Sequence, residues 1–277
     1  MGLRIATNMA SQSVQKNLSE VSNKSQESLE KLSSGKRVNK ASDDAAGLAI
    51  ATNLKAQTQG LRQATRNAND GVSMVQTAEG GLNEVSNILV RLRELTIQAA
   101  SDTVGEDERG FLDLEYQQLS TEVDRIAEST TFNGTNLLNG EGGGVLDIQV
   151  GTYSGEQNRI GFDSDAANAT ADEIGIGGTS IADKGDALDA IENIDGAIKA
   201  VSGHRANLGS IQSRLQSTVA NLETQTINQE SARSVIEDVD VAAETASMAS
   251  ANVVKSAAVA SLAQANQIPN SALRLIG

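Results

Sequence analysis

The segment from Ile236 to Ala260 has the sequence IEDVDVAAETASMASANVVKSAAVA and sets the packing problem of the whole chain. Small and apolar residues recur in it at alternating steps of three and four, which places them on one stripe of a long helix, as in a coiled coil. The stripe contains Ile236, Val239, Ala243, Ala246, Ser250, Val253, Ala257 and Ala260. A buried methyl group contributes about 0.8 kcal/mol, against about 1.5–3 kcal/mol for a buried leucine side chain. Because one pairing along this stripe buries so little, we expect the helix to need several neighbours, some from other copies of the chain.

Residues 1–34 repeat this pattern at the other end of the chain and are predicted to form an amphipathic helix. Its stripe contains Val14, Leu18, Val21, Ser25, Ser28 and Leu32, with Ile5 and Met9 ahead of them. Because two of these six stripe positions are serine, this surface is also weakly apolar. The basic and polar sequence from Ser33 to Lys40 then interrupts the pattern, which predicts a linker.

A second, longer helix is predicted to start at Ser42, whose hydroxyl would cap it, with Asp43 and Asp44 at its positive end. No proline occurs from there to Ala100, so we expect one helix about 85 Å long, despite several glycines within it. Its stripe contains Leu54, Leu61, Ala68, Val72, Val75, Leu82, Val85, Ile88, Leu92, Leu95 and Ala99.

The centre of the chain combines a shorter helix with a β-hairpin. A polar break is predicted over 102–110, a helix over 112–128 with Leu119, Val123, Ile126 and Ala127 facing inward, and a turn over 130–134. Alternation over 145–150, followed by a short run over 159–163, predicts one β-hairpin on an otherwise helical protein. The small, polar and glycine-rich residues 164–182 predict a loop.

Helix is expected to resume near Lys184 with a heptad stripe and to extend to a second linker over 223–231. This stripe contains Ala187, Ile191, Ile194, Ile198, Val201, Leu208, Leu215, Val219 and Leu222. The alanine-rich helix that follows is predicted to run to about Gln267, with Pro269 as its stop.

The order of weak and strong stripes is mirrored about the centre of the chain, which predicts a mainly α fold. We expect a long antiparallel helical bundle or coiled-coil rod with a small β-hairpin region, in which the N- and C-terminal helices pair. The predicted domains are residues 1–42 together with 230–277, and residues 43–229, which include the hairpin and loop near 140–182. Because the terminal stripes are weak, the two ends are expected to stay disordered in a free monomer.

Composition excludes several classes of function. The chain has no cysteine and one histidine, so disulfides, thiolate chemistry and zinc clusters are not expected. Gly175–Ser180 lacks the lysine of a phosphate-binding loop, and no catalytic, cofactor or metal site is predicted. Residues 1–42 carry seven Lys or Arg and three Glu, but without aromatic residues this favours a solvated helix face over nucleic-acid binding or membrane insertion. No signal-peptide-like run occurs in residues 1–25, and Lys255 argues against a C-terminal membrane span.

Several blocks of the chain, taken in order, resemble the bacterial flagellins. They are Ser33-Ser34-Gly35-Lys36-Arg37-Val38-Asn39, Ala41-Ser42-Asp43-Asp44-Ala45-Ala46-Gly47-Leu48-Ala49-Ile50, Leu92-Arg93-Glu94-Leu95, Thr131-Phe132-Asn133-Gly134 and Leu262-Ala263-Gln264-Ala265-Asn266-Gln267. The similarity covers about 1–150 and 184–277, in the order found in the family. A single block would be weak, but all of them in order are specific.

The resemblance implies a structural, non-enzymatic subunit, exported without a cleaved signal peptide through the flagellar type III apparatus and polymerised outside the cell into a hollow helical filament for motility. It implies that the terminal helices form an inner tube and that the longer helices and hairpin form a shell around it. It also implies an export chaperone and hook-associated junction and cap proteins as partners. Only residues 164–182 separate the hairpin from the returning helix, so the variable outer domains of many flagellins are expected to be missing.

Two sets of site residues follow from the stripes and the resemblance. The expected polymer-interface residues are Val14, Leu18, Val21, Ile236, Val239, Val253, Ala257 and Leu262. Some flagellins are sensed by a Toll-like receptor through a helix patch, whose matching positions here are Arg91, Leu95 and Glu115. The simpler interpretation of that patch is a set of shell residues used in subunit contacts. The alternative functions are a hook–filament junction protein, a membrane- or nucleic-acid-binding helix protein, and an independent coiled-coil adhesin.

Overall fold

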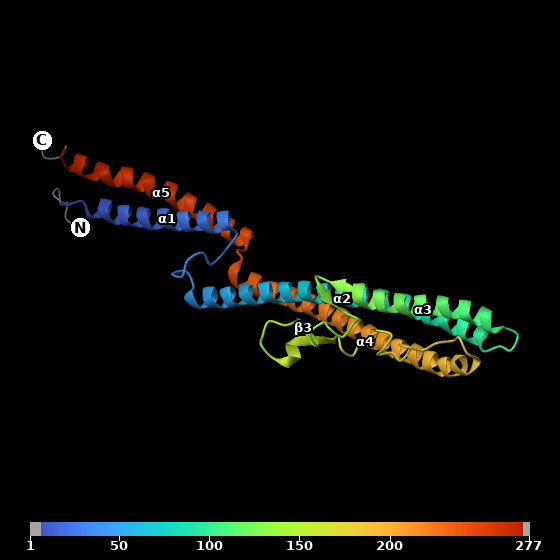
Figure 1. The fold of residues 1–277 in the computed structure, drawn as a ribbon. Coiled ribbons are helices and arrows are strands. Elements are labelled where there is room, and N and C mark those ends of the chain that lie inside the picture. Colours follow the sequence, from blue (N-terminus) through green and yellow to red (C-terminus); the bar gives the residue numbers. More distant parts are fainter. Residues whose placement is uncertain (1–6, 274–277) are drawn as a thin grey trace. The chain divides into compact units, whose positions relative to one another are not determined.

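The computed structural model describes residues 7–273, with side chains up to Gln267, and within this range the fold is mainly α-helical, as predicted (Figure 1). The helices are α1 (Met9–Ser34), α2 (Ala45–Ala99), α3 (Glu106–Ser129), α4 (Lys184–Glu237) and α5 (Val241–Leu273), with a short 3-10 turn, η1, at Glu156–Asn158. The strands are β1 (Thr131–Phe132), β2 (Thr135–Asn136), β3 (Val145–Gln149) and β4 (Arg159–Asp163). Ile5, which the first stripe included, lies outside the described residues.

The chain forms two compact units. One combines the two ends of the chain, up to Ala56 and from Asn228 onward, and contains the pair α1 and α5. The other is Gln57–Ile227, which contains α3, the strands and most of α2 and α4. The predicted pairing of the N- and C-terminal helices is therefore confirmed, since α1 and α5 lie side by side (Figure 1).

The middle unit has a continuous apolar core between α2, α3 and α4. The predicted stripe of α2 supplies Leu82, Leu92 and Leu95, each at most 1% exposed, and Leu89, which lay outside that stripe, is fully buried as well. Further fully buried core side chains are Tyr116, Val123 and Ala127 of α3, Phe162 of β4, and Ala187, Ile194, Val201, Leu208 and Leu215 of α4. At the edge of this core Arg93 Nε donates to Asp195 Oδ1 at 2.7 Å, joining α2 to α4.

The glycines of α2 do not interrupt the helix, and two of them lie where other segments pack closely against it. A Cβ atom at Gly71 would lie 2.6 Å from Cδ1 of Ile148, and one at Gly81 would lie 2.7 Å from Cδ1 of Leu138. The absence of a side chain at these positions lets the hairpin and the β1–β2 region reach the helix surface. The prediction of one unbroken helix up to residue 99 is confirmed.

The gap between α2 and α3 covers residues 100–105, whereas the sequence predicted a break over 102–110. The break is shorter than 102–110, because α3 already begins at Glu106 with three acidic residues in its first turn, where the helix dipole favours them. Arg109, which we expected in the break, closes it: its Nε donates to the carbonyl of Ala99 at 2.8 Å and its Nη2 to that of Ser101 at 3.1 Å.

The cap of α2 is Asp44, and the predicted cap at Ser42 is wrong. Asp44 Oδ1 accepts the backbone N–H of Gly47 at 2.8 Å, while Ser42 lies ahead of the helix. Asp43 instead folds the linker, since its Oδ2 accepts the N–H groups of Lys40 and Asn39. These two hydrogen bonds hold the pKa of Asp43 below its usual value.

There are two small antiparallel hairpins in the described chain, where the sequence predicted one. The predicted strands β3 and β4 pair in the register Leu146↔Phe162 and Ile148↔Ile160. The predicted turn at 130–134 is itself a hairpin of β1 and β2, closed by Asn133 and Gly134 with φ angles of 52° and 79°. Each of its strands has only two residues, too few for an alternation pattern to be seen in the sequence.

Residues 164–182 form no regular strand or helix, as predicted, but they belong to the core. Ile174, Ile176 and Ile181 are each at most 5% exposed. Carboxylates of α3 fix the segment: Asp124 Oδ1 accepts the N–H of Ala171 at 2.7 Å, and Asp113 Oδ1 that of Ile181 at 2.8 Å. The chain's histidine, His204, packs half-buried against this region, and burial lowers its pKa, with Glu173 acting in the opposite direction.

The predicted second linker at 223–231 is wrong, because α4 continues without interruption to Glu237. That segment is polar but contains no glycine or proline, and polarity alone does not end a helix. The break lies at Asp238–Asp240, where Asp240 Oδ1 caps α5 by accepting the N–H of Ala242 at 2.9 Å. Pro269 is also not a stop, since α5 extends to Leu273.

The break pairs with the first linker within the terminal unit. Lys36 and Asp238 form an isolated antiparallel bridge, the N–H of Val239 donates to the carbonyl of Gly35 at 3.0 Å, and Lys36 Nζ lies 2.5 Å from Glu237 Oε1. Val38 of the linker is 2% exposed. The segment predicted as a polar linker is therefore a packed junction.

Candidate interface on the terminal helices

The predicted stripe of α1 faces α5. Ser11 and Ser28 are buried, at 8% and 3% exposed, and the side chains of the other stripe positions are half-buried. The half-buried residues are Val14, Leu18, Val21, Ser25 and Leu32. The helical period predicted for residues 9–34 is therefore confirmed. The contact of α1 with α5 consists largely of serine and of isolated apolar side chains.

The stripe of α5 does not face α1 as predicted. Its members Ala243, Ala246, Ser250, Val253, Ala257 and Ala260 are all exposed. Within residues 241–267, the buried or half-buried side chains are instead Glu244, Ser247, Met248, Ala251, Ala258, Leu262 and Ala265. The prediction assumed one continuous helix through Asp238–Asp240, but the helix is broken there. The positions predicted to face inward on α5 were therefore assigned to the wrong face. Ile236 and Val239 accordingly lie outside α5 and are half-buried at the junction.

Several large apolar side chains are exposed on the terminal pair, and its helix α5 is nearly uncharged. Between Val241 and Gln267 only Glu244 and Lys255 carry a charge. The exposed large apolar side chains of this pair, with their exposed fractions, are Met9 65%, Leu29 58%, Val241 61%, Val253 69%, Val254 48% and Val259 52%. Several large apolar side chains exposed on a nearly uncharged helix favour a contact with another molecule. Of the predicted interface residues, Val253 and Ala257 lie on this surface, whereas Val14, Leu18, Val21 and Leu262 belong to the α1–α5 contact.

The second predicted patch lies on α2 and α3 of the middle unit. Arg91 Nη2 lies 2.8 Å from Glu115 Oε1 and its Nη1 lies 3.1 Å from Glu94 Oε2, and Glu115 followed by Glu94 raises the pKa of Arg91. The three side chains are exposed. Leu95, in contrast, is 1% exposed and packs in the core. The structure thus brings Arg91 and Glu115 together but places Leu95 beneath the surface.

Exposed apolar side chains occur on the same two helices, and sequence reasoning missed them. They are Val90 and Ile97 of α2 and Phe111 and Leu114 of α3, which are 48–72% exposed. Each lies off the inward stripe of its helix. The available signal was a large apolar residue out of phase with the core period.

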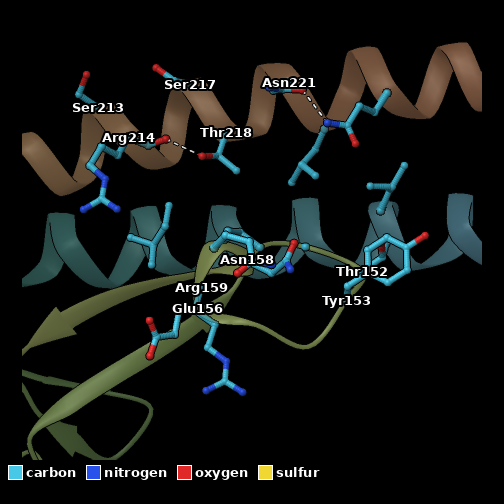
Figure 2. A pocket seen from close by; sticks show the side chains of 17 residues that line it. Thr152, Tyr153, Glu156, Asn158, Arg159, Ser213, Arg214, Ser217, Thr218 and Asn221 are labelled. Carbon is cyan, nitrogen blue, oxygen red and sulfur yellow. Dashed lines mark hydrogen bonds between the residues drawn. The ribbon is translucent and has the colours of Figure 1, made fainter.

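The polar side chains that line a groove of the middle unit do not converge as expected of a small-molecule site. It measures about 630 Å³ and lies between the β3–β4 turn and α4 (Figure 2). Ser213 and Ser217 point away from the hairpin, while Glu156 and Arg159 point away from α4, so the polar groups are not aimed at one point.

Within residues 7–267, no group of three or more His, Cys, Asp or Glu side chains is arranged to hold a metal ion. None of the helices in the described part of the chain is long and apolar enough to cross a membrane.

A pair of long helices with exposed apolar side chains, together with a well-packed helical middle unit, is typical of a structural protein. Comparison with known proteins gives the family. Residues 5–142 match the bacterial flagellin N-terminal helical region, and residues 191–276 match the bacterial flagellin C-terminal helical region. The segment between the two matches holds the β3–β4 hairpin, the buried loop and the start of α4.

Individual relatives agree with the family match. A flagellin of Halalkalibacterium halodurans is 42% identical over 235 residues, which are 85% of each chain. Flagellin FlaB1 of Treponema pallidum is 37% identical over 85% of this chain and 86% of that protein. Among solved structures, Bacillus cereus flagellin is 33% identical, with a TM-score of 0.51, over 57% of this chain and 88% of that chain.

The chain belongs to the bacterial flagellin family: it is a structural, non-enzymatic subunit of the flagellar filament, outside the cell. The family predicted from the sequence blocks is confirmed. A putative flagellar hook-associated protein from Vibrio parahaemolyticus matches with a TM-score of 0.59 over 70% of this chain and 99% of that chain. At 17% identity that match shows a shared fold alone.

Proposed function

We propose that the exposed stripe of α5 and the outer face of α1 form the contacts between copies at the centre of the filament. In this arrangement residues 1–42 and 230–277 make the inner tube and residues 43–229 the surrounding shell. Val253 and Ala257 contact neighbouring copies directly. Val14, Leu18, Val21, Ile236, Val239 and Leu262 support that surface from within each chain.

The observation that carries the proposal is the exposure of Val253, at 69%, on a helix face almost without charge. Fully burying a valine side chain contributes about 1.5–3 kcal/mol, and the same contact repeats at every subunit of a polymer. The exposed alanines beside it let neighbouring helices approach closely. The contact with α1 inside one chain uses a different face of α5, so the outer stripe stays available.

Polymerisation of charge variants on this surface tests the proposal. Purified chain is expected to form long filaments alone, and the Val253→Asp variant is expected to stay monomeric. Persistent monomer from the unmodified chain would instead favour the junction role.

The same surface offers a docking place for the accessory proteins of assembly. Its apolar side chains need a cover before polymerisation and at the two ends of the filament, where one neighbour is missing. We therefore assign to it the contacts with the export chaperone and with the hook-associated junction and cap proteins.

We also propose that Arg91 and Glu115 contribute to recognition by a Toll-like receptor, because both are exposed and joined across α2 and α3. Purified monomer is expected to activate the receptor, and Arg91→Ala to need at least about tenfold more protein, as for an interface arginine. The matched control is Arg125→Ala, which removes an exposed arginine of α3 that is paired with Glu122. A silent wild-type monomer, or equal losses in both variants, would contradict this role.

A further inference from the structure

The α1–α5 contact has little to fix its register. The buried side chains along it are small: Ser11 and Ser28 on α1, and Ala251 and Ala265 on α5. A slip of one helical turn that brings Ser247 and Ser261 of α5 to the places of Ala251 and Ala265 would again put small side chains there. In weakly apolar helix pairs, buried polar residues are what specify register.

Polar contacts cross between the two helices within residues 8–266. Asn8 Nδ2 donates to the carbonyl oxygen of Ala265 at 2.9 Å, Ser11 Oγ donates to Asn266 Oδ1 at 2.9 Å, and Ser25 Oγ donates to Asn252 Oδ1 at 3.1 Å. Two of them lie together where α1 begins.

Asn8 uses both ends of its side-chain amide. Its Oδ1 accepts the backbone N–H of Ser11 at 3.1 Å, which caps α1, while its Nδ2 reaches α5. The start of α1 and its position along α5 are therefore set by the same side chain.

The acceptor on α5 is made available by a proline. In an α-helix the carbonyl of residue i receives the N–H of residue i+4. For Ala265 that residue is Pro269, which has no N–H, although α5 continues through it to Leu273. Ala265 is only 6% exposed, so its carbonyl has limited access to water as a replacement donor. The Asn8 amide supplies the missing donor.

We propose that Asn8 is a positioning residue that fixes the register of α1 on α5 by donating to the carbonyl that Pro269 leaves without its helical partner. Pro269 distinguishes one position along α5, because it leaves the carbonyl of Ala265 without its helical donor on an otherwise repetitive surface. Only one alignment of the two helices brings Asn8 to it. The contact lies within one chain, so the proposal does not depend on which faces pack between copies.

Asn8→Asp separates the two tasks of the residue. The aspartate keeps the oxygen that caps α1, where a negative charge is also favourable, but it loses the donor to Ala265. Pro269→Ala restores a backbone N–H to the same carbonyl. Asn8→Asp should therefore do harm in the native background and much less in the Pro269→Ala background.

Register can be measured with disulfides, because the chain has no cysteine of its own. In assembled filaments, the pair Ser25→Cys and Asn252→Cys reports the native register. Ser25→Cys with Met248→Cys or Ser256→Cys reports a slip of one turn. Non-reducing gels separate bonds within a chain from bonds between chains, since only the latter produce dimers.

Asn8→Asp is expected to lower the ratio of native to slipped cross-links by about two- to tenfold, the effect of one hydrogen bond, and Pro269→Ala to cancel most of that change. If Asn8→Asp does not assemble, rescue of assembly by Pro269→Ala supports the proposal and failure of rescue overturns it. An unchanged cross-link ratio in Asn8→Asp, or an equal fall in both backgrounds, also overturns it.

Discussion

The Val253→Asp variant is expected to remain monomeric under conditions in which the unmodified chain forms filaments. Val253 is 69% exposed in the single chain, so an aspartate there meets water and leaves the middle unit intact. In the proposed contact between copies the same position is enclosed, and an unpaired carboxylate in such a place is strongly unfavourable. The substitution therefore acts on the polymer and not on the fold.

The size of the effect follows from the cost of burying a charge without a partner, which is several kcal/mol per ion. Since each 1.4 kcal/mol changes an equilibrium tenfold, the concentration needed for assembly should rise by at least about a hundredfold. Sedimentation of polymer at increasing protein concentration measures this threshold directly.

Val253→Thr is the matched control, because it keeps the branched shape of valine and adds no charge. It is expected to assemble at a threshold much closer to that of the unmodified chain. Circular dichroism of the monomers should show the same helix content in all three proteins. Filaments of Val253→Asp at the normal threshold would show that this face of α5 stays exposed in the polymer.

The Phe162→Ala variant is expected to destabilise the middle unit by about 3–5 kcal/mol, the loss typical of a large aromatic side chain removed from a core. Phe162 is fully buried and pairs with Leu146 across the β3–β4 hairpin. Its removal leaves a cavity where the hairpin meets the helices. Chemical denaturation, followed by near-ultraviolet circular dichroism, measures the free energy of unfolding, since the buried Tyr116 reports on this core.

The same substitution at an exposed phenylalanine serves as the control. Phe111 of α3 is 72% exposed, so Phe111→Ala should change the free energy of unfolding by no more than about 0.5 kcal/mol. Equal destabilisation by the two substitutions would mean that the hairpin is not part of the core.

The sequence predicted the middle unit well where large side chains repeat over many turns. The leucines of α2 and the isoleucines and leucines of α4 leave only one inward face possible, and those faces are buried as expected. The loop at 164–182 was predicted only as irregular, because its isoleucines follow no period and its anchors, Asp113 and Asp124, are distant in sequence.

The weak stripes were harder to assign for a physical reason. On α5 the difference between alanine and serine carries little energy, so composition did not determine which face turns toward α1. The break at Asp238–Asp240 is set by contacts with residues 35–37, which no local pattern could indicate. The predicted stripe is instead the outer face, which gives Val253 and Ala257 their place in the proposed polymer contact.

The patch around Arg91 shows the same limit. Sequence similarity selects positions, but it does not separate the exposed Arg91 from the buried Leu95 four residues later. The helical period did so, because it placed Leu95 on the inward stripe of α2, and the two kinds of sequence signal disagreed at this residue.

Hydrogen exchange of monomer and filament tests the central claim most directly, that the terminal helices are stabilised by neighbouring copies. Amides over 9–34 and 241–267 are expected to exchange rapidly in the monomer and to become strongly protected in the filament. Amides near Leu82–Leu92 should be protected in both states, since that core is complete within one chain. Equal protection of the ends and the middle in the monomer, unchanged on assembly, would contradict the claim.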